Sequence, residues 1–240
     1  CQDITERKKA EESHRLAQLG RLLSEMAHEV NNPLMIISGR AEFALIEGIR
    51  DEKTRDTLNT ILEQCFFAKE IIQRLLKYSR LGKVEKKPLE MKKTLELVSS
   101  ILEHHLRMAN IVLEQDIAPD LPSFLGNEKE VQEVFMNIMR NSADAMPEGG
   151  KIMIKARKQG DYISIDFTDT GEGMTRNVLE NIFEPFFTTK QQGTGLGLAL
   201  SHTIIQEHGG QLRYESRIGK GTTATVLIPV ISPAQHIERG

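Results

Sequence analysis

The sequence lacks any apolar run near the roughly 20 residues that a membrane-spanning helix needs, and no basic and apolar signal segment opens it. Its two cysteines, Cys1 and Cys65, cannot form a disulfide framework, which favours a reducing compartment. The net charge of -3 provides no large positive field for nucleic acid. We therefore expect a cytoplasmic chain that binds no nucleic acid. Because it begins with Cys1, we expect a piece of a longer protein, whose membrane attachment stays open.

What is present is an ordinary globular composition, 39% hydrophobic and 27% charged. Apolar residues recur near the 3.6-residue period from Ile4 to about Gly48, and again from Leu58 to Leu76. The polar turn "RDEKT" separates the two patterns. Each predicted helix has a wide apolar stripe that a lone hairpin cannot bury. We therefore predict an all-α antiparallel helical hairpin that pairs with a second copy in a dimeric four-helix bundle.

From Leu89 onward the pattern changes to α and β elements. One predicted helix opens with a capping box of Asn127 and Glu130, and residues 151–169 alternate as a hairpin that turns at Gln159 to Asp161. The other predicted elements are helices over 91–108 and 196–208 and strands over 110–117, 211–216 and 222–230. This order fits a second domain in which helices cover one face of a mixed sheet, an α/β sandwich.

Three polar islands stand among these apolar elements. Asn137, Asn141 and Asp144 share one face of a helix, where their oxygens can bind hydrated magnesium or simply face solvent. Asp169 opens "DTGEGM" directly after a strand and is a fixed acceptor that suits the exocyclic amine of adenine. The two glycines of this segment, Gly171 and Gly173, allow a ligand to approach the backbone closely. A surface turn would also explain them.

The third island, "TTKQQGTGLGLAL", places three glycines before a helix. The free N–H groups and the dipole of a helix N-terminus suit phosphates. The pattern is neither the dinucleotide fingerprint nor the P-loop.

In this order, the three islands resemble the N, G1 and G2 boxes of the ATPase superfamily that unites histidine kinases, gyrase, Hsp90-type chaperones and mismatch-repair ATPases. "FEPFFTTK" resembles the F box of the kinases. The resemblance implies a Bergerat-type ATP-binding domain in which Asn141 holds magnesium, Asn137 and Asp144 line the site, and Asp169 takes the adenine amine. It also implies a lid over the phosphates at 188–195. The other implied ATP-binding residues are Gly171, Gly173, Lys190, Gly193, Thr194, Gly195, Leu196 and Gly197.

"HEVNNPL", residues 28–34, resembles the H box of sensor histidine kinases, in which the histidine is the phosphoacceptor. A neutral imidazole at His28 can attack the γ-phosphate of ATP if the other ring nitrogen can share its proton. The resemblance assigns that acid-base role to Glu29. Asn32 lies one turn after His28, and an acid followed three residues later by Asn supports hydrolysis of a phosphorylated response regulator in the family. Pro33 predicts a bend in this helix.

The resemblance implies a sensor histidine kinase core that moves phosphate from ATP to His28, with Mg2+, and then to an aspartate of a response regulator receiver domain. We also expect a homodimer and an upstream sensor, because "DITERKKAEE" resembles a PAS junction. Two alternatives are a serine protein kinase of the same superfamily and a noncatalytic ATP-gated scaffold. The intact Asn141, Asp169 and His28 argue against the scaffold, and Glu29 argues against the serine kinase.

The expected organisation has five parts: a linker over 1–12, the dimerisation and phosphotransfer domain over 13–82, a second linker over 83–88, the ATP-binding domain over 89–232 and a tail over 233–240. Without a cysteine cluster or an H-E-x-x-H motif, we expect no zinc site. We expect His104 and His105 on a helix flank, and His208 near a helix C-terminus, where positive charge is tolerated.

Overall fold

The computed structural model describes residues 30–49, 51–79, 85–190 and 193–231. The chain divides into two compact units, Cys1–Leu81 and Gly82–Gly240. No helix within the described ranges combines the length and apolar character that a bilayer span requires.

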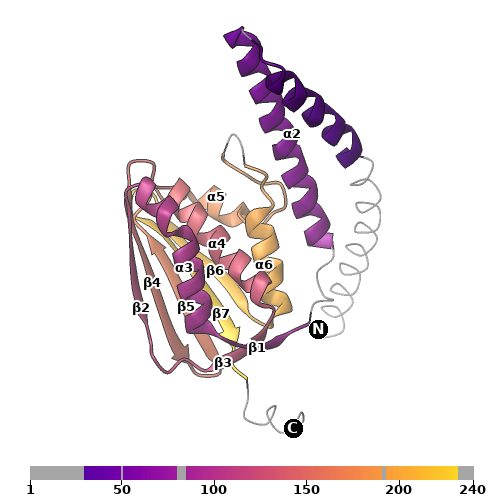
Figure 1. Ribbon diagram of the computed structural model, residues 1–240. Coiled ribbons are helices and arrows are strands. Elements are labelled where there is room, and N and C mark those ends of the chain that lie inside the picture. The colour runs from indigo at the N-terminus through magenta and orange to yellow at the C-terminus, as the bar shows by residue number, and fades with distance from the viewer. Residues whose placement is uncertain (1–29, 50, 80–84, 191–192, 232–240) are drawn as a thin grey trace. The chain divides into compact units, whose positions relative to one another are not determined.

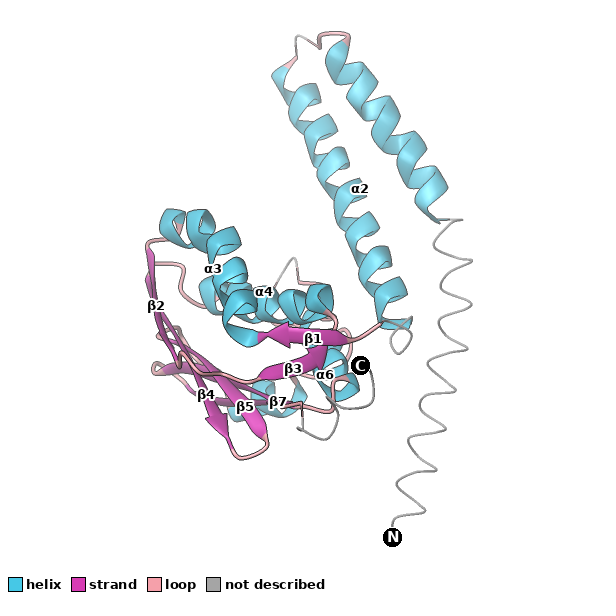
Figure 2. Cartoon of the chain, turned by 60° about the horizontal axis from the view of Figure 1, so that its bottom comes forward, coloured by secondary structure: helices cyan, strands magenta, loops and turns pink. Residues whose placement is uncertain are grey.

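The described residues of the first unit form two helices, one over residues 30–46 and α2 (Glu52–Ser79). They lie side by side in opposite directions (Figures 1 and 2), so the predicted helical hairpin is confirmed. The first helix ends before Gly48, whose φ of 88° is left-handed. At the start of α2, Asp51 Oδ2 accepts the N–H of Thr54 over 2.9 Å.

Many large apolar side chains of this hairpin are exposed. The first helix contains most of them, at exposed fractions between 40% and 81%: Val30, Met35, Ile36, Ile37, Phe43 and Ile46. Residues 4–29 of the predicted first helix lie outside the described residues, so the bend expected at Pro33 stays a prediction.

The second unit contains seven strands and four helices among its described residues. The strands are β1 (Lys87–Glu90), β2 (Ile111–Ile117), β3 (Ser123–Gly126), β4 (Gly150–Gln159), β5 (Tyr162–Asp169), β6 (Gln211–Arg217) and β7 (Gly221–Pro229). The helices are α3 (Met91–Met108), α4 (Glu128–Asp144), α5 (Arg176–Asn181) and α6 (Gly197–Glu207).

Five strands form one mixed sheet in the order β2-β4-β5-β7-β6, and β1 pairs with β3 separately. Strand β2 runs parallel to β4, while the other neighbours are antiparallel. Gln159 pairs with Tyr162, which leaves Gly160 and Asp161 as a two-residue turn where the sequence predicts one. The α/β sandwich is confirmed.

The hydrophobic core lies between the five-stranded sheet and the helices α3, α4 and α6, which cover one of its faces (Figure 1). Alternate side chains of β5 point to this core, because Ile163, Ile165 and Phe167 are fully buried. On the opposite face, Thr225 Oγ1 donates to Asp166 Oδ1 over 2.7 Å. The sheet is thus apolar toward the helices and polar on the other side.

Three elements were not predicted: β1, β3 and α5. Each has only four to six residues, too few for a clear period. Residues 87–88 lie in β1, although the sequence placed them in a linker.

The capping box is half correct. Asn127 Oδ1 accepts the N–H of Glu130 over 3.1 Å as predicted. The N–H of Asn127, however, donates to His208 Nε2 over 3.0 Å rather than to Glu130. His208, which is distant in sequence, thus accepts the N–H that the glutamate accepts in a complete capping box.

Candidate functional site

Helix α4 forms one wall of the candidate site. Asn137 and Asn141 are half-buried and Asp144 is exposed, at spacings that place all three on one side of the helix. The adjacent side of α4 faces the core through Val134, Phe135 and Ile138, which are at most 1% exposed. Packing of the apolar side therefore fixes the direction of the polar side.

Asn137 joins this wall to α6. Its Nδ2 donates to Ser201 Oγ over 3.0 Å, and Ser201 Oγ donates to Gly197 O over 2.9 Å. A Cβ atom on Gly197 would lie 2.6 Å from Asn137 Oδ1, so a larger residue here would force the Asn137 side chain to shift. Ser201 was not singled out in the sequence, because it stands among apolar residues.

A cation already lies against the α4 wall. Lys190 Nζ donates to Asn141 Oδ1 over 2.8 Å and to Asp144 Oδ2 over 2.6 Å. Both oxygens therefore face the same positively charged group. A hydrated magnesium ion would bind oxygens arranged in this way. The donor set fits that metal, and Lys190 comes from the loop that the sequence assigned to phosphates.

Asp169, the last residue of β5, is 4% exposed. Its Oδ1 accepts the backbone N–H groups of Gly171 and Thr222, both over 3.0 Å. Burial raises the pKa of Asp169, while these two N–H groups and the Ser142 hydroxyl oppose that rise. The carboxylate is thus held in one orientation, with Oδ2 as the oxygen that the two N–H groups leave for a ligand donor.

Backbone hydrogen bonds fix the loop that follows Asp169. Glu172 N donates to Ala145 O over 3.1 Å at the end of α4, and Gly219 N donates to Glu172 O over 2.7 Å. Met174 N donates to Ser216 Oγ over 2.8 Å. Gly171 and Gly173 therefore lie in a loop that these hydrogen bonds tie to the α4 end and to the β6–β7 turn.

The glycine-rich segment closes at its base and leads into α6. Phe186 N donates to Gly195 O over 3.0 Å, and Gly195 takes a φ of 65°, which favours glycine. Between Phe186 and Gly195, Gly193 N donates to Lys190 O over 3.2 Å. Leu196 is 1% exposed, and its N–H donates to Thr194 Oγ1 over 3.4 Å.

An aromatic cluster lies beside α6. The Phe183 ring stacks on His202 with centroids 4.4 Å apart and meets Tyr214 edge-on at 5.8 Å. Burial lowers the pKa of His202 and, with the charge of Asp169, raises that of Tyr214. The buried Tyr214 hydroxyl has no hydrogen-bond partner within the described part of the chain. Phe183 opens the segment "FEPFFTTK", but its contacts with His202 and Tyr214 join residues far apart along the chain, for which the sequence pattern holds no signal.

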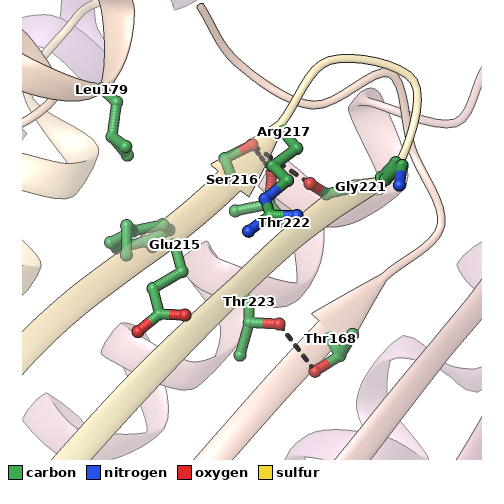
Figure 3. Close-up of a pocket in the computed structure, with 10 residues that line it drawn as sticks. Thr168, Leu179, Glu215, Ser216, Arg217, Gly221, Thr222 and Thr223 are labelled. Carbon is green, nitrogen blue, oxygen red and sulfur yellow. Dashed lines mark hydrogen bonds between the residues drawn. The ribbon is translucent and has the colours of Figure 1, made fainter. Parts of the chain in front are cut away.

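A shallow pocket lies at the β6–β7 turn (Figure 3). Thr168 and Thr223 are joined there by a 3.0 Å hydrogen bond, and Ser216 Oγ donates to Gly221 O over 3.1 Å. None of the site residues predicted from the sequence lines this pocket. The pocket is therefore not the candidate site, although its residue Thr222 donates its N–H to Asp169.

The residues of the first unit are only partly described. His28 and Glu29 lie outside the described residues, and Asn32 is an exposed residue of the helix over 30–46. The side-chain oxygen of Asn31 is buried and has no partner among the described residues.

Two family models match the chain. Residues 18–83 match the His Kinase A (phospho-acceptor) domain. Residues 126–232 match the family described as histidine kinase-, DNA gyrase B- and HSP90-like ATPase.

Among curated relatives, the chain is 33% identical to sporulation kinase C of Bacillus subtilis, over 96% of this chain and 56% of that protein. It is 31% identical to the sensor protein FixL of Bradyrhizobium diazoefficiens, over 90% of this chain and 44% of that protein. The chain thus spans about half the length of these relatives.

Among solved structures, the histidine kinase ThkA in complex with the response regulator protein TrrA is similar, with 26% identity and a TM-score of 0.68. The match covers 96% of this chain and 66% of that chain. Full-length ShkA in complex with AMPPNP matches at a TM-score of 0.75 and 21% identity, over 88% of this chain and 46% of that chain, which shows a shared fold.

Proposed function

The chain belongs to the sensor histidine kinases of two-component systems, and from that premise we propose that it transfers the γ-phosphate of ATP to His28 and then to an aspartate of a response regulator. The observation that carries this proposal is that Asn141 and Asp144 together accept hydrogen bonds from the Lys190 ammonium group. Such an arrangement suits a nucleotide whose phosphates arrive with a divalent metal.

Asp169 would bind the base of ATP. Its Oδ2 would accept the exocyclic amine of adenine, while Oδ1 stays with Gly171 and Thr222. Guanine presents a carbonyl at the same place, so an ionised carboxylate would reject it. Gly171 and Gly173 would lie against the base, as their position beside Asp169 supports.

The phosphates would lie between α4 and the start of α6. Asn141 would hold Mg2+, which supplies charge neutralisation on the transferring phosphate when bound. Asn137 and Asp144 would line the site, and Lys190 would turn to the phosphates. Gly193, Thr194, Gly195, Leu196 and Gly197 would surround the phosphates near the N-terminus of α6, where the helix dipole suits anions.

His28 would attack as a neutral imidazole, and Glu29 would accept the proton that its other ring nitrogen gives up. Asn32 would position a water for hydrolysis of the phosphorylated regulator, which adds phosphatase activity. In-line attack requires His28 to reach the γ-phosphate, so positioning supplies much of the rate.

The hairpin would form a homodimer. Its exposed apolar residues, such as Met35, Ile36 and Phe43, provide the surface that a four-helix bundle would bury. The proposed boundaries are 13–82 for this domain and 89–232 for the ATP-binding domain, with linkers at 1–12 and 83–88 and a tail at 233–240. The complex of ThkA with the response regulator protein TrrA supports a receiver domain as the substrate. An upstream sensor would supply the signal.

Incubation with radiolabelled ATP and Mg2+ tests the proposal, with His28→Gln as the variant and the exposed His104→Gln as its control. We expect acid-labile, alkali-stable label in the wild type and in His104→Gln, and none in His28→Gln. Acid-stable label that survives His28→Gln would instead indicate a serine kinase. Absence of label despite ATP binding would indicate a noncatalytic scaffold.

A further inference from the structure

His208, which directly follows α6, is 4% exposed, and both of its ring nitrogens are engaged. Nδ1 lies 2.7 Å from Ile204 O, and Nε2 lies 3.0 Å from Asn127 N. A backbone N–H only donates and a carbonyl only accepts. The ring therefore carries its proton on Nδ1 and is neutral, at the helix C-terminus where the sequence places it.

Asn127 and Lys86 extend this contact. Asn127 Nδ2 donates to Glu85 O over 3.4 Å, just before β1. Lys86 Nζ donates to Glu207 O at the end of α6. We call Lys86, Asn127 and His208 the α4–α6 clamp. It joins the N-terminus of α4, the C-terminus of α6 and the chain that enters β1.

The same two helices meet again at the candidate site, through the hydrogen bond from Asn137 to Ser201. At a rise of 1.5 Å per residue, Asn137 lies about 15 Å from Asn127 along the axis of α4. Helices that are joined at two separate points cannot slide past each other unless one joint breaks. The clamp thus controls how Asn137 meets α6.

We propose that the α4–α6 clamp positions the nucleotide site: neutral His208 holds α4 against α6 in the arrangement that binds ATP, and protonation of His208 weakens ATP binding. The inference rests on the proposed function, since ATP is its ligand. Protonated Nε2 is a donor and cannot accept the N–H of Asn127. Glu130 Oε2, 3.9 Å from Nε2, is the acceptor to which the protonated ring would turn.

The charged groups that face the ring are Lys86, Glu130 and Glu207. Burial has the largest effect and lowers the pKa of His208, and Lys86 lowers it further, while the Ile204 carbonyl and the two glutamates raise it. Because the folded pKa lies below the ordinary 6.5, the contribution of neutral His208 is fully present above that pH. It is lost as the pH falls through the lowered value.

The test measures the dissociation constant for ATP, with Mg2+, at about pH 7.5 and about pH 5.5 on the whole chain. At the higher pH, His208→Leu should bind at least about fivefold more weakly, the lower end of typical coupling between sites. His208→Gln should bind almost as the wild type does, because its side-chain oxygen can accept the N–H of Asn127. His104→Gln controls for the loss of an exposed histidine.

At the lower pH, the wild type and His104→Gln should lose more affinity than His208→Gln, which does not titrate. Equal pH dependence in the wild type and His208→Gln, or wild-type affinity in a folded His208→Leu, would overturn the inference. If His208→Leu does not fold, the comparison with His208→Gln decides alone. A wild-type chain that binds no ATP at either pH would instead contradict the proposed function.

Discussion

Lys190 Nζ lies 2.6 Å from Asp144 Oδ2 and bridges from there to Asn141, so a side-chain ammonium occupies the oxygens that would approach a divalent metal. The two cations cannot share this place without repulsion. Metal binding and the contact of Lys190 with α4 are therefore alternatives.

Replacement of Lys190 by Met should lower the Mg2+ concentration that half-saturates ATP binding by about fivefold, because about 1 kcal/mol of repulsion between nearby charges disappears. Titration of Mg2+ at fixed ATP measures this value. Lys158→Met, which removes an exposed lysine of β4, controls for the change in net charge. A half-saturating concentration that rises in Lys190→Met would contradict this competition.

Asn141→Ala should reduce phosphorylation of His28 by about 100-fold or more, because the side-chain oxygen for the metal is lost and a metal supplies several kcal/mol. Asn141→Asp keeps an oxygen at that position and should retain part of the rate. Initial rates of labelling give both values. The control is Asn177→Ala, an exposed asparagine of α5. Equal labelling rates in Asn141→Ala and Asn177→Ala would show that Asn141 does not hold the metal.

Asp169→Asn should weaken ATP binding by about 10- to 100-fold, the range for loss of a hydrogen bond to a charged group. The variant should nevertheless melt at the same or a higher temperature. Burial raises the pKa of Asp169, so folding disfavours its ionised form, and an amide oxygen can still accept from Gly171 and Thr222.

Calorimetric titration and thermal melting test this separation of binding from stability. Asp166→Asn is the control, because Asp166 lies on the same strand but faces the polar side of the sheet. A large fall in melting temperature for Asp169→Asn, with ATP binding retained, would assign Asp169 a structural role instead.

Gly197→Ala should destabilise the second unit by about 1–3 kcal/mol, the usual cost of overpacking. The added Cβ would meet Asn137 Oδ1 and displace the side chain that donates to Ser201. Ser201→Ala should cost a similar amount, because Asn137 Nδ2 loses its partner. Urea unfolding measures both, with the exposed Ser100→Ala as control. Wild-type stability in both variants would show that the contact between Asn137 and Ser201 does not stabilise the second unit.

Local signals explain why much of the fold was predictable. The helix predicted over 91–108 is α3, and Asn127 caps α4 as expected. The hairpin turn at Gly160 follows from a two-residue connection between alternating strands. In each case, the information lies within a few neighbouring residues.

Contacts between distant segments explain what was missed. The pairing of β1 with β3 and the parallel pairing of β2 with β4 depend on partners far along the chain. His208 could not be read as neutral, because its burial and its bond to Asn127 come from α4. The predicted grouping of Asn137, Asn141 and Asp144 came from helix geometry alone, whereas the bridge from Lys190 required the tertiary fold.

The hydrogen bond from Phe186 N to Gly195 O closes the glycine-rich segment at its neck. The entropy cost of loop closure grows only slowly, by about 0.6 kcal/mol for each doubling of length. Residues inserted between 187 and 194 would leave the strands and α6 undisturbed. This segment can therefore change length during evolution while the strands and helices of the domain stay as they are.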